Sequence, residues 1–320
     1  MNGSITDVPG IEVGHAQNLE GPTGCTVVLC RKGAVPGVDS RGGAPATRET
    51  DGLRPENMLP IMHAVFLTGG SAYGLDCAGG IMRCLEEQNV GFNIGVAVVP
   101  IVAGAALNDL AFGDPKIRPD VAMGFEACRN ASANERRQGN IGAGAGACVG
   151  RLAGNACGMM KGGLGTASLK VGELIVGAIV AVNCNGDVVD PETGKLLAGT
   201  LTPDRKSIAG ARGLLCTPGG RYGEGFPANT TIGVVATNAA LTKGAATRVA
   251  MNAQDGLAHT IHPVHTMGDG DVIFCMGAGS VQADLTRLCA IAAWVMAGAI
   301  VNAVRAAETL HGVPSMKELP

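Results

Sequence analysis

The sequence predicts a layered α/β fold, and three observations support this prediction. The chain has 320 residues and is 46% hydrophobic, which is enough to bury a sizeable core. Its 50 glycines and its aromatic content of 3% favour sheets and helices that approach one another through small side chains. Short β-branched runs bounded by glycine occur together with longer amphipathic stretches. We therefore expect sheets that are covered by helices.

Seven short apolar runs have the composition of buried strands. They are rich in β-branched residues and are bounded by Gly, Asn or Asp, as strands usually are. In chain order the expected strands are Gly10–Val13, Cys25–Cys30, Ala64–Thr68, Phe92–Val99, Ile175–Val182, Thr231–Thr237 and Val272–Met276.

Three longer stretches have apolar residues at three- and four-residue spacing, which predicts helices over about Ala72–Glu87, Lys243–His259 and Leu285–Ala307. The longest apolar run, Leu288–Val301, has 14 residues and is too short to span a bilayer, so we expect a core helix. Several strands follow one another without an intervening helix. An αββα sandwich therefore competes with a doubly wound parallel sheet, and in either case we expect residues 1–320 to form a single domain.

Charge, cysteine usage and motif content exclude several classes of partner. The net charge is −3, and no Lys/Arg run is present, which argues against nucleic acid. The eleven cysteines lack a CxxC pair and are expected to be reduced, buried thiols. The N-terminus lacks the pattern of a signal peptide, and no phosphate-loop, dinucleotide or metal-ligand spacing occurs. We expect a cytoplasmic protein without a metal, cofactor or membrane partner.

Asn229-Thr230-Thr231 precedes the apolar run that begins at Ile232. This places a hydroxyl nucleophile at the start of a buried strand, where Thr230 can cut the bond that follows Asn229 by an N-to-O acyl shift and hydrolysis. The cut frees the α-amino group of Thr230, whose ordinary pKa of about 8 suits a general base. The same residues are also typical of a simple turn before a strand.

Asp269-Gly270-Asp271 stands directly before the strand expected from Val272. Residues two apart in an extended segment point to the same side, so both carboxylates can face one site and hold a hydroxyl or an ammonium. An acidic pair there could orient an N-terminal Thr230. The alternative interpretation is an Asp-Gly turn without a chemical role.

Asn183 follows the strand expected over Ile175–Val182 and precedes Cys184-Asn185-Gly186, which we expect to form a hairpin turn. A side-chain amide at a strand end can donate a hydrogen bond to an oxyanion, which is worth about 2.7–4 kcal/mol in a transition state. The alternative is that Asn183 only helps to form the turn.

Two further regions have weaker patterns. The segment from Asp187 to Ala228 is rich in Pro and Gly and lacks a long apolar period, so we expect an exposed connection that leads to Asn229. His259, His262 and His265 are interpreted as helix-terminal or surface residues, because Pro263 interrupts any helix that would carry them.

Taken in order, these segments resemble the P1 (S58) family of self-processing N-terminal nucleophile hydrolases. This family includes L-aminopeptidase/D-esterases, β-peptidyl aminopeptidases and 6-aminohexanoate-oligomer (nylon) hydrolases. The resemblance covers nearly the whole chain. The two site segments that carry it are Asn229-Thr230-Thr231 and His265-Thr266-Met267-Gly268-Asp269-Gly270-Asp271. It also rests on Ile5-Thr6-Asp7-Val8-Pro9-Gly10-Ile11, Gly21-Pro22-Thr23-Gly24-Cys25-Thr26-Val27, Asp39-Ser40-Arg41-Gly42-Gly43, Leu67-Thr68-Gly69-Gly70-Ser71-Ala72-Tyr73-Gly74-Leu75 and Lys161-Gly162-Gly163-Leu164-Gly165-Thr166-Ala167-Ser168.

The resemblance implies an αββα sandwich and self-cleavage into residues 1–229 and 230–320, which remain associated. It makes Thr230 the nucleophile, Asp269 and Asp271 the pair that orients and charges it, and Asn183 the oxyanion amide. A threonine at the cut and an aspartate at position 269 are more similar to the nylon-hydrolase branch than to the β-peptidyl aminopeptidases. The implied function is amide hydrolysis of short peptides or amide oligomers by a homo-oligomer of cleaved pairs.

Two positions of the expected substrate site depart from the family pattern. Asn108 stands where these enzymes often have tyrosine, and Arg151 stands where lysine is common. Arginine keeps the charge but presents a fork suited to a carboxylate, and asparagine opens the pocket. An unprocessed family member without catalysis therefore stays open. An acyltransferase of the ornithine acetyltransferase type also stays open, because such enzymes likewise resemble this chain in self-cleavage before a threonine.

Overall fold

One long strand, β2 (Thr23–Ser40), is shared by two sheets. In this computed structural model, which describes residues 1–152, 158–217 and 229–318, the first half of β2 pairs with β1 and β4, and its last residues pair with β16. The first sheet contains β1 (Glu12–Asn18), β4 (Met62–Thr68), β7 (Val102–Ala106) and β3 (Thr47–Arg48). The second contains β10 (Gly163–Val171), β11 (Leu174–Val182), β14 (Ile232–Ala239) and β16 (Val272–Val281).

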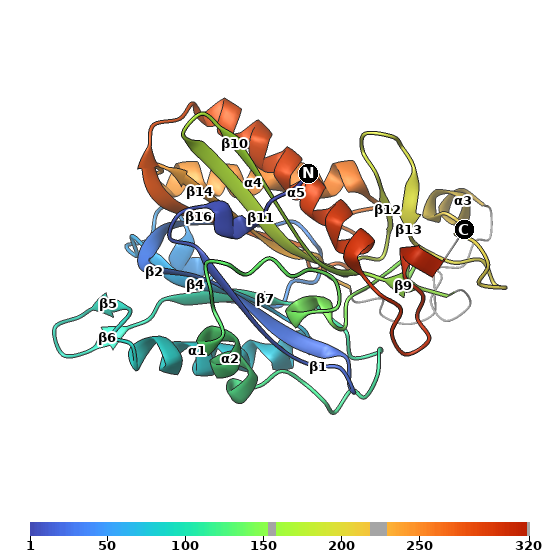
Figure 1. Ribbon diagram of the computed structural model, residues 1–320, viewed down its shortest axis with the longest axis horizontal. Coiled ribbons are helices and arrows are strands. Elements are labelled where there is room, and N and C mark those ends of the chain that lie inside the picture. The colour runs from blue at the N-terminus through green and yellow to red at the C-terminus, as the bar shows by residue number, and fades with distance from the viewer. Residues whose placement is uncertain (153–157, 218–228, 319–320) are drawn as a thin grey trace.

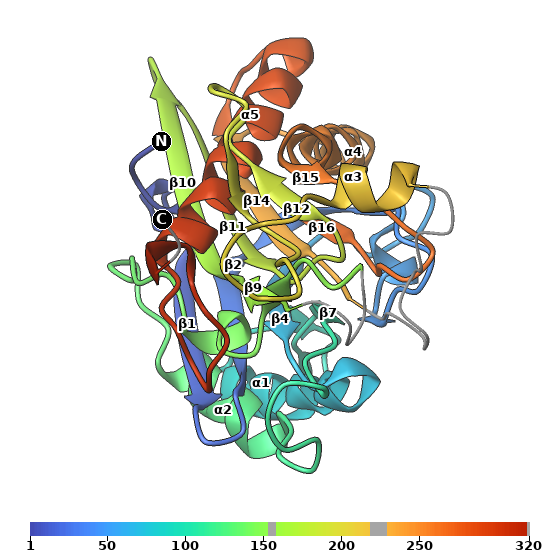
Figure 2. The same cartoon turned by 90° about the vertical axis from the view of Figure 1, so that its right-hand side faces the viewer.

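Two pairs of helices cover the outer faces of these sheets. α1 (Cys77–Glu86) and α2 (Val121–Arg129) pack against the first sheet. α4 (Lys243–Thr260) and α5 (Leu285–Ala306) pack against the second. Both views show α4 and α5 on one side of the sheets and α1 and α2 on the opposite side (Figure 1, Figure 2). The predicted αββα sandwich is confirmed.

Alternation along the strands separates three layers of core. On β4, Val65 and Leu67 point between the two sheets, whereas Ala64 and Phe66 point toward α1 and α2. β16 alternates in the same way, with one set of side chains between the sheets and the other set against α4 and α5. Each strand is therefore apolar on both faces, which explains why the strands appear as continuous apolar runs in the sequence.

The alternative of a doubly wound parallel sheet is wrong. Most neighbouring strands are antiparallel, and among the described strands only the pairs β4–β7 and β14–β16 are parallel. Each parallel pair is joined through a helix on the outer face, α1 in the first sheet and α4 in the second. The connection between β14 and β16 has a direct consequence for the site, because parallel neighbours begin at the same edge of a sheet.

Several expected elements differ in the structure. The strand expected over Phe92–Val99 is a hairpin of β5 (Phe92–Asn93) and β6 (Val98–Val99), with Ile94 and Val96 exposed. The helix expected from Ala72 begins as a 3₁₀ turn, and α1 starts at Cys77. The strand expected over Gly10–Val13 begins two residues later, as β1, and extends to Asn18. The sequence interpretation missed β3, β7, β10 and α2 (Val121–Arg129), and also the short pair β8 (Cys148–Val149) and β9 (Met160–Lys161).

The expectation of an exposed connection from Asp187 holds for residues 191–195 and 203–207 but is wrong for residues 187–190 and 197–201, most of which are buried. A small sheet forms there from β12 (Asp187–Val189), β13 (Leu196–Ala198) and β15 (Ile261–His262), and α3 (Ala211–Cys216) follows. The carboxylate of Asp187 is buried and accepts hydrogen bonds from the backbone N–H groups of Thr200 and Ala211. Residues 218–228 lie outside the described residues.

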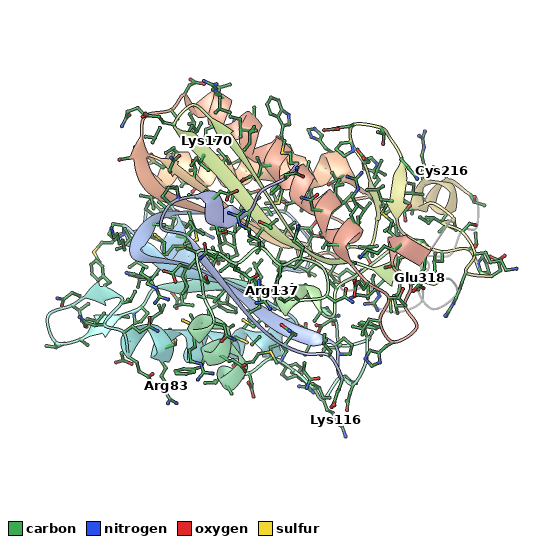
Figure 3. All side chains as sticks on the ribbon, viewed as in Figure 1. Arg83, Lys116, Arg137, Lys170, Cys216 and Glu318 are labelled. Carbon is green, nitrogen blue, oxygen red and sulfur yellow. The ribbon has the colours of Figure 1, made fainter. Side chains whose placement is uncertain are left out.

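α5 has the length and composition of a membrane span, but it packs on β10 and β11 as a core helix. The sandwich also encloses most of the thiols. Nine of the ten cysteines in the described ranges are buried, and Cys216 lies at the surface (Figure 3). Cys157 is outside these ranges.

Candidate active site

Strand register brings three separate segments to one edge of the second sheet. Ile232 at the start of β14 pairs in parallel with Val272 at the start of β16. It also pairs in antiparallel register with Ala181 near the end of β11. Residues that precede β14, precede β16 and follow β11 therefore meet. These are the segments that contain Thr230, Asp269 with Asp271, and Asn183.

Thr230 is 4% exposed, and its hydroxyl contacts the carbonyl oxygen of Asn229, the residue before it. The same carbonyl oxygen accepts a hydrogen bond of 3.0 Å from the backbone N–H of Gly270. The backbone N–H of Thr230 donates to the carbonyl oxygen of Asn183 over 2.6 Å. The peptide bond before Thr230 is thus held by Gly270, which precedes β16, and by Asn183, which follows β11.

The two carboxylates flank this bond and are held by different partners. Asp271 accepts a hydrogen bond of 2.8 Å from the backbone N–H of Thr231. Asp269 accepts bonds from the backbone and side-chain N–H groups of Asn185 and from Thr266. Asp271 therefore holds the residue that follows Thr230, whereas Asp269 is held by the segments that follow β11 and precede β16.

Electrostatics distinguishes the two aspartates. Burial, and then repulsion from the nearby charge of Asp271, raises the pKa of Asp269 to about 6, although the hydrogen bonds from Thr266 and Asn185 act in the opposite direction. The charge of the pair also contributes to the raised pKa of the buried Cys184 thiol, for which burial is the larger cause. Ionisation of Asp269 beside the charge of Asp271 therefore costs free energy unless a cation binds next to the two carboxylates.

Asn183 is buried, with its side-chain amide fixed at both ends. Its Oδ1 accepts from the backbone N–H of Cys148 over 2.9 Å, and its Nδ2 donates to the carbonyl oxygen of Asn108 over 3.1 Å. The expected hairpin turn after Asn183 is wrong, because β12 pairs with β13 and β15 and not with β11. The polypeptide leaves the second sheet at this point.

The two positions that depart from the family pattern both lie beside the site. The guanidinium of Arg151 donates from Nη1 to the side-chain oxygen of Asn229 over 3.2 Å. Asn108 meets Asn183 through its backbone carbonyl, while its own side chain accepts from the backbone N–H of Leu110. Arg151 therefore faces the bond before Thr230, whereas the Asn108 side chain is turned into its own loop.

Sequence reasoning missed several partners of the predicted residues. His265 places Nδ1 2.8 Å from Oδ2 of Asp271 and also donates its backbone N–H to that oxygen, so it is a site residue and the surface interpretation is wrong. Thr266, Asn185 and the backbone of Gly270 belong to the same site. His265, Thr266 and Gly270 lie within the segment His265–Asp271 that carries the resemblance, but no role was assigned to them there, and Asn185 had no sequence signal beyond the turn expected after Asn183.

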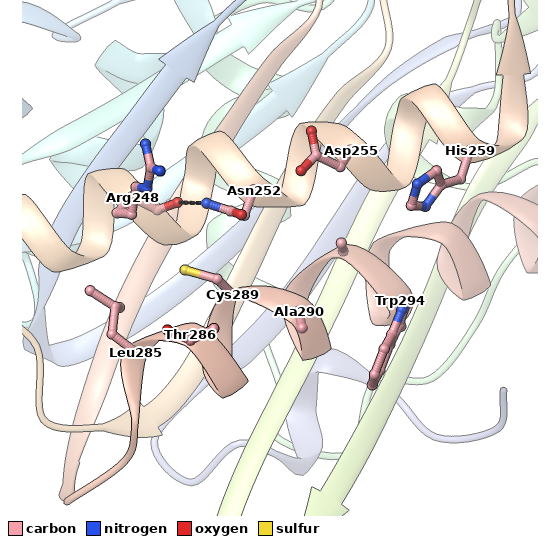
Figure 4. A pocket seen from close by; sticks show the side chains of 10 residues that line it. Arg248, Asn252, Asp255, His259, Leu285, Thr286, Cys289, Ala290 and Trp294 are labelled. Carbon is pink, nitrogen blue, oxygen red and sulfur yellow. Dashed lines mark hydrogen bonds between the residues drawn. The ribbon is translucent and has the colours of Figure 1, made fainter.

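A separate groove of about 500 Å³ lies on the outer side of the second helix pair, between α4 and α5, and Trp294 stands at one end of it (Figure 4). None of its lining residues belongs to the edge that contains Thr230. Within the described ranges no group of three or more His, Cys, Asp or Glu side chains is arranged to hold a metal ion.

The sandwich has relatives among solved structures. It superposes on the L-aminopeptidase D-Ala-esterase/amidase of Ochrobactrum anthropi, described as a variant of the Ntn hydrolase fold, with a TM-score of 0.72. The match covers 97% of this chain and 88% of that protein at 19% sequence identity. The fold is therefore that of an N-terminal nucleophile hydrolase.

The sequence comparisons identify the family within this fold. The profile of peptidase family S58 matches residues 3–317, and the chain belongs to this family. It is 42% identical to an uncharacterized aminopeptidase of Mycobacterium leprae, over 98% of this chain and 92% of that protein. It is 30% identical to a 6-aminohexanoate-oligomer endohydrolase of Agromyces sp. strain KY5R, over 93% and 84%. The protein is thus a hydrolase of the S58 family.

Proposed function

We propose that the chain cuts itself between Asn229 and Thr230 and then acts as an N-terminal threonine amide hydrolase. In the first reaction the Thr230 hydroxyl adds to the Asn229 carbonyl carbon, the peptide nitrogen leaves as the Thr230 amine, and water cleaves the resulting ester. The products are residues 1–229 with a new carboxylate and residues 230–320 with a new amine.

The observation that carries this proposal is the environment of the Asn229 carbonyl. Its oxygen contacts the Thr230 hydroxyl and accepts the Gly270 N–H, which is positioned to stabilise charge that develops on that oxygen. Thr230 is also the residue whose backbone nitrogen is held by the Asn183 carbonyl, so the new amine keeps an acceptor after the cut. These contacts supply a nucleophile, an electrophile and an oxyanion donor in one place.

In turnover the Thr230 amine takes the proton of its own hydroxyl, and the hydroxyl attacks the substrate amide. We propose that the Asn183 amide and backbone N–H groups stabilise the oxyanion. We also propose that Asp269 and Asp271 stabilise the charged form of the Thr230 amine. We place Arg151 on the substrate side, together with Asn108, which contributes its backbone carbonyl beside the Asn183 amide. The proposed substrates are short peptides or amide oligomers with a free amino end, among them 6-aminohexanoate oligomers, because the acidic pair favours an ammonium and relatives carry aminopeptidase and oligomer endohydrolase names.

We also propose that the enzyme is cytoplasmic and assembles as a homo-oligomer of cleaved pairs. Buried, unpaired thiols in the described ranges agree with a reducing compartment. Size-exclusion chromatography with light scattering tests the assembly.

The decisive experiment is the intact mass of the purified protein under denaturing conditions, with the new N-terminus sequenced. Self-cleavage gives pieces of about 23 and about 9 kDa, in proportion to 229 and 91 of the 320 residues, and the smaller begins Thr-Thr-Ile-Gly. Thr230→Ala should remain one chain and be inactive. Turnover by that variant would contradict the nucleophile assignment, and an uncut wild-type chain would favour the non-catalytic alternative. Transfer of the acyl group to an added amine would mark the acyltransferase alternative.

A further inference from the structure

The uncut chain contains its own substrate. In the proposed self-cleavage the acyl group that reaches the Thr230 oxygen is Asn229, and in turnover it is the first residue of the substrate. Both must present a carbonyl carbon to the same hydroxyl, and both form the same type of ester. The contacts of Asn229 therefore describe the subsite for the substrate's acyl residue, and this inference rests on the proposed function.

The subsite is closed around the short side chain of Asn229. Asn229 is 1% exposed. Its backbone N–H donates to the Gly268 carbonyl over 2.9 Å, and its carbonyl accepts from Gly270. Its side-chain oxygen accepts from Arg151 over 3.2 Å. A substrate that follows this path places its amino group near Gly268 and its side chain against Arg151.

Two features favour an acidic side chain over an amide at this position. The Nδ2 group of Asn229 is buried and has no acceptor among the described residues, so the amide leaves one donor unsatisfied. Within the same residues, Arg151 forms no ion pair with a carboxylate. A carboxylate has no donor to satisfy, and it matches the planar fork of a guanidinium.

We propose that Arg151 makes the enzyme selective for substrates whose first residue is aspartate, with asparagine second. The substrate's ammonium lies toward Gly268 and the Asp269–Asp271 pair, and its side-chain carboxylate binds Arg151. The Thr230 hydroxyl displaces the amine of the second residue, which leaves with the hydroxyl proton. Water then hydrolyses the ester, releasing free aspartate and restoring the hydroxyl.

The test compares kcat/KM of the cleaved wild-type enzyme on four dipeptides, Asp-Gly, Asn-Gly, Leu-Gly and Ala-Gly. The proposal expects Asp-Gly to exceed Leu-Gly by about 10- to 100-fold, the range typical of a site that binds a polar group directly. Arg151→Met should lower the Asp-Gly to Leu-Gly ratio by about tenfold or more, whereas Arg129→Met, at an exposed arginine of α2, should leave the ratio unchanged.

Arg151→Met can also slow self-cleavage, because Arg151 holds Asn229. If this variant remains uncut, competitive inhibition of the wild type by free aspartate, compared with leucine, decides instead. Stronger inhibition by aspartate supports the proposal. A cleaved wild type that prefers Leu-Gly, or an unchanged ratio in a cleaved Arg151→Met, overturns the selectivity and leaves the proposed function intact. An uncut, inactive wild type overturns the proposed function itself.

Discussion

The ammonium group of Lys161 lies 2.7 Å from the carbonyl oxygen of Ala147 and 2.9 Å from that of Ala145, within a side chain that has no exposed surface. Burial lowers the pKa of this lysine, and the charge of the buried Asp109 acts in the opposite direction. The next residue after Ala147 is Cys148, whose N–H holds the side chain of Asn183. Lys161 therefore fixes the segment that orients the proposed oxyanion amide.

Replacing Lys161 by methionine should impair both stability and turnover. The carbonyl group of Ala145 loses its donor inside the fold, and that of Ala147 keeps only the N–H of Gly162, which should lower the free energy of unfolding by about 1–3 kcal/mol. A loosened Asn183 amide should lower kcat by about tenfold or more, with a smaller effect on KM. Thermal unfolding and steady-state kinetics measure the two effects, and Lys170→Met, at an exposed lysine of β10, is the matched control.

A double-mutant cycle separates positioning from general damage to the fold. In an Asn183→Ala background, Lys161→Met should cost no further kcat, because the amide that it orients is already absent. Additive losses in the two variants would contradict the positioning role.

Gly270→Ala should block self-cleavage. A methyl group at this position would lie 2.9 Å from the Thr230 hydroxyl oxygen and 2.5 Å from the carbonyl oxygen of Ala44. The backbone must shift, and the Gly270 N–H then moves away from the Asn229 carbonyl. The uncut fraction of freshly purified protein, measured by mass, should rise from a minority to nearly all of the sample.

Gly244→Ala provides the control for this change, because its methyl group meets nothing closer than 3.9 Å, at the exposed start of α4. This variant should cut itself like the wild type. Normal cleavage in Gly270→Ala would show that the Gly270 N–H does not assist the reaction.

The layers of the fold could be predicted from the sequence, but the sharing of β2 could not. Apolar residues on both faces of β4, β14 and β16 give continuous runs that indicate strands buried between two layers. The second half of β2 follows Arg31 and Lys32 and has no such run, although it joins the two sheets. Its place depends on pairing with β16, which lies more than 200 residues further along the chain.

In the candidate site, too, the position of a residue at a strand end could be predicted, but its contacts with distant segments could not. Thr230, Asn183 and the two aspartates adjoin apolar runs, so their positions at strand ends could be read from the sequence. The direction of the Asn183 amide could not, since it is set by Cys148 and the Asn108 carbonyl. His265 was missed because it lies two residues after Pro263 in a segment without a periodic pattern that would relate it to a carboxylate.

The raised pKa of Asp269 predicts a pH-dependent stability. The folded-state pKa of about 6 exceeds the ordinary value of 3.8, so the folded chain binds this proton more tightly than the unfolded chain. The contribution of Asp269 to the free energy of unfolding is therefore largest below about pH 4. It declines by up to about 3 kcal/mol as the pH rises through about 6.

Denaturant unfolding between pH 4 and 7 measures this effect, with Thr230→Ala as the parent so that the chain stays whole. At each pH the free energy of unfolding of the Asp269→Asn derivative is subtracted from that of this parent, which removes the contributions of other titrating groups. Asparagine also loses hydrogen bonds from Thr266, which adds an offset that does not depend on pH. A difference that stays constant over this range would contradict the raised pKa.

Adjacent glycines of α1 provide a test of the packing between α1 and α2. Gly80 is buried, and a methyl group there would lie 1.8 Å from the carbonyl oxygen of Val121 and 2.6 Å from the backbone nitrogen of Phe125. Gly79 is exposed, and a methyl group there would lie 3.6 Å from a side-chain methyl of Val121, an ordinary contact. The same substitution should therefore have opposite effects at two neighbouring positions.

Gly79→Ala should stabilise the protein by about 0.5–1 kcal/mol, because alanine restricts the unfolded chain and favours the helix. Gly80→Ala should destabilise it by about 1–3 kcal/mol, because two helix backbones must separate. Chemical denaturation of both variants in the Thr230→Ala parent measures the two changes directly. If Gly80→Ala were as stable as Gly79→Ala, the close approach of the α1 and α2 backbones at this point would be wrong.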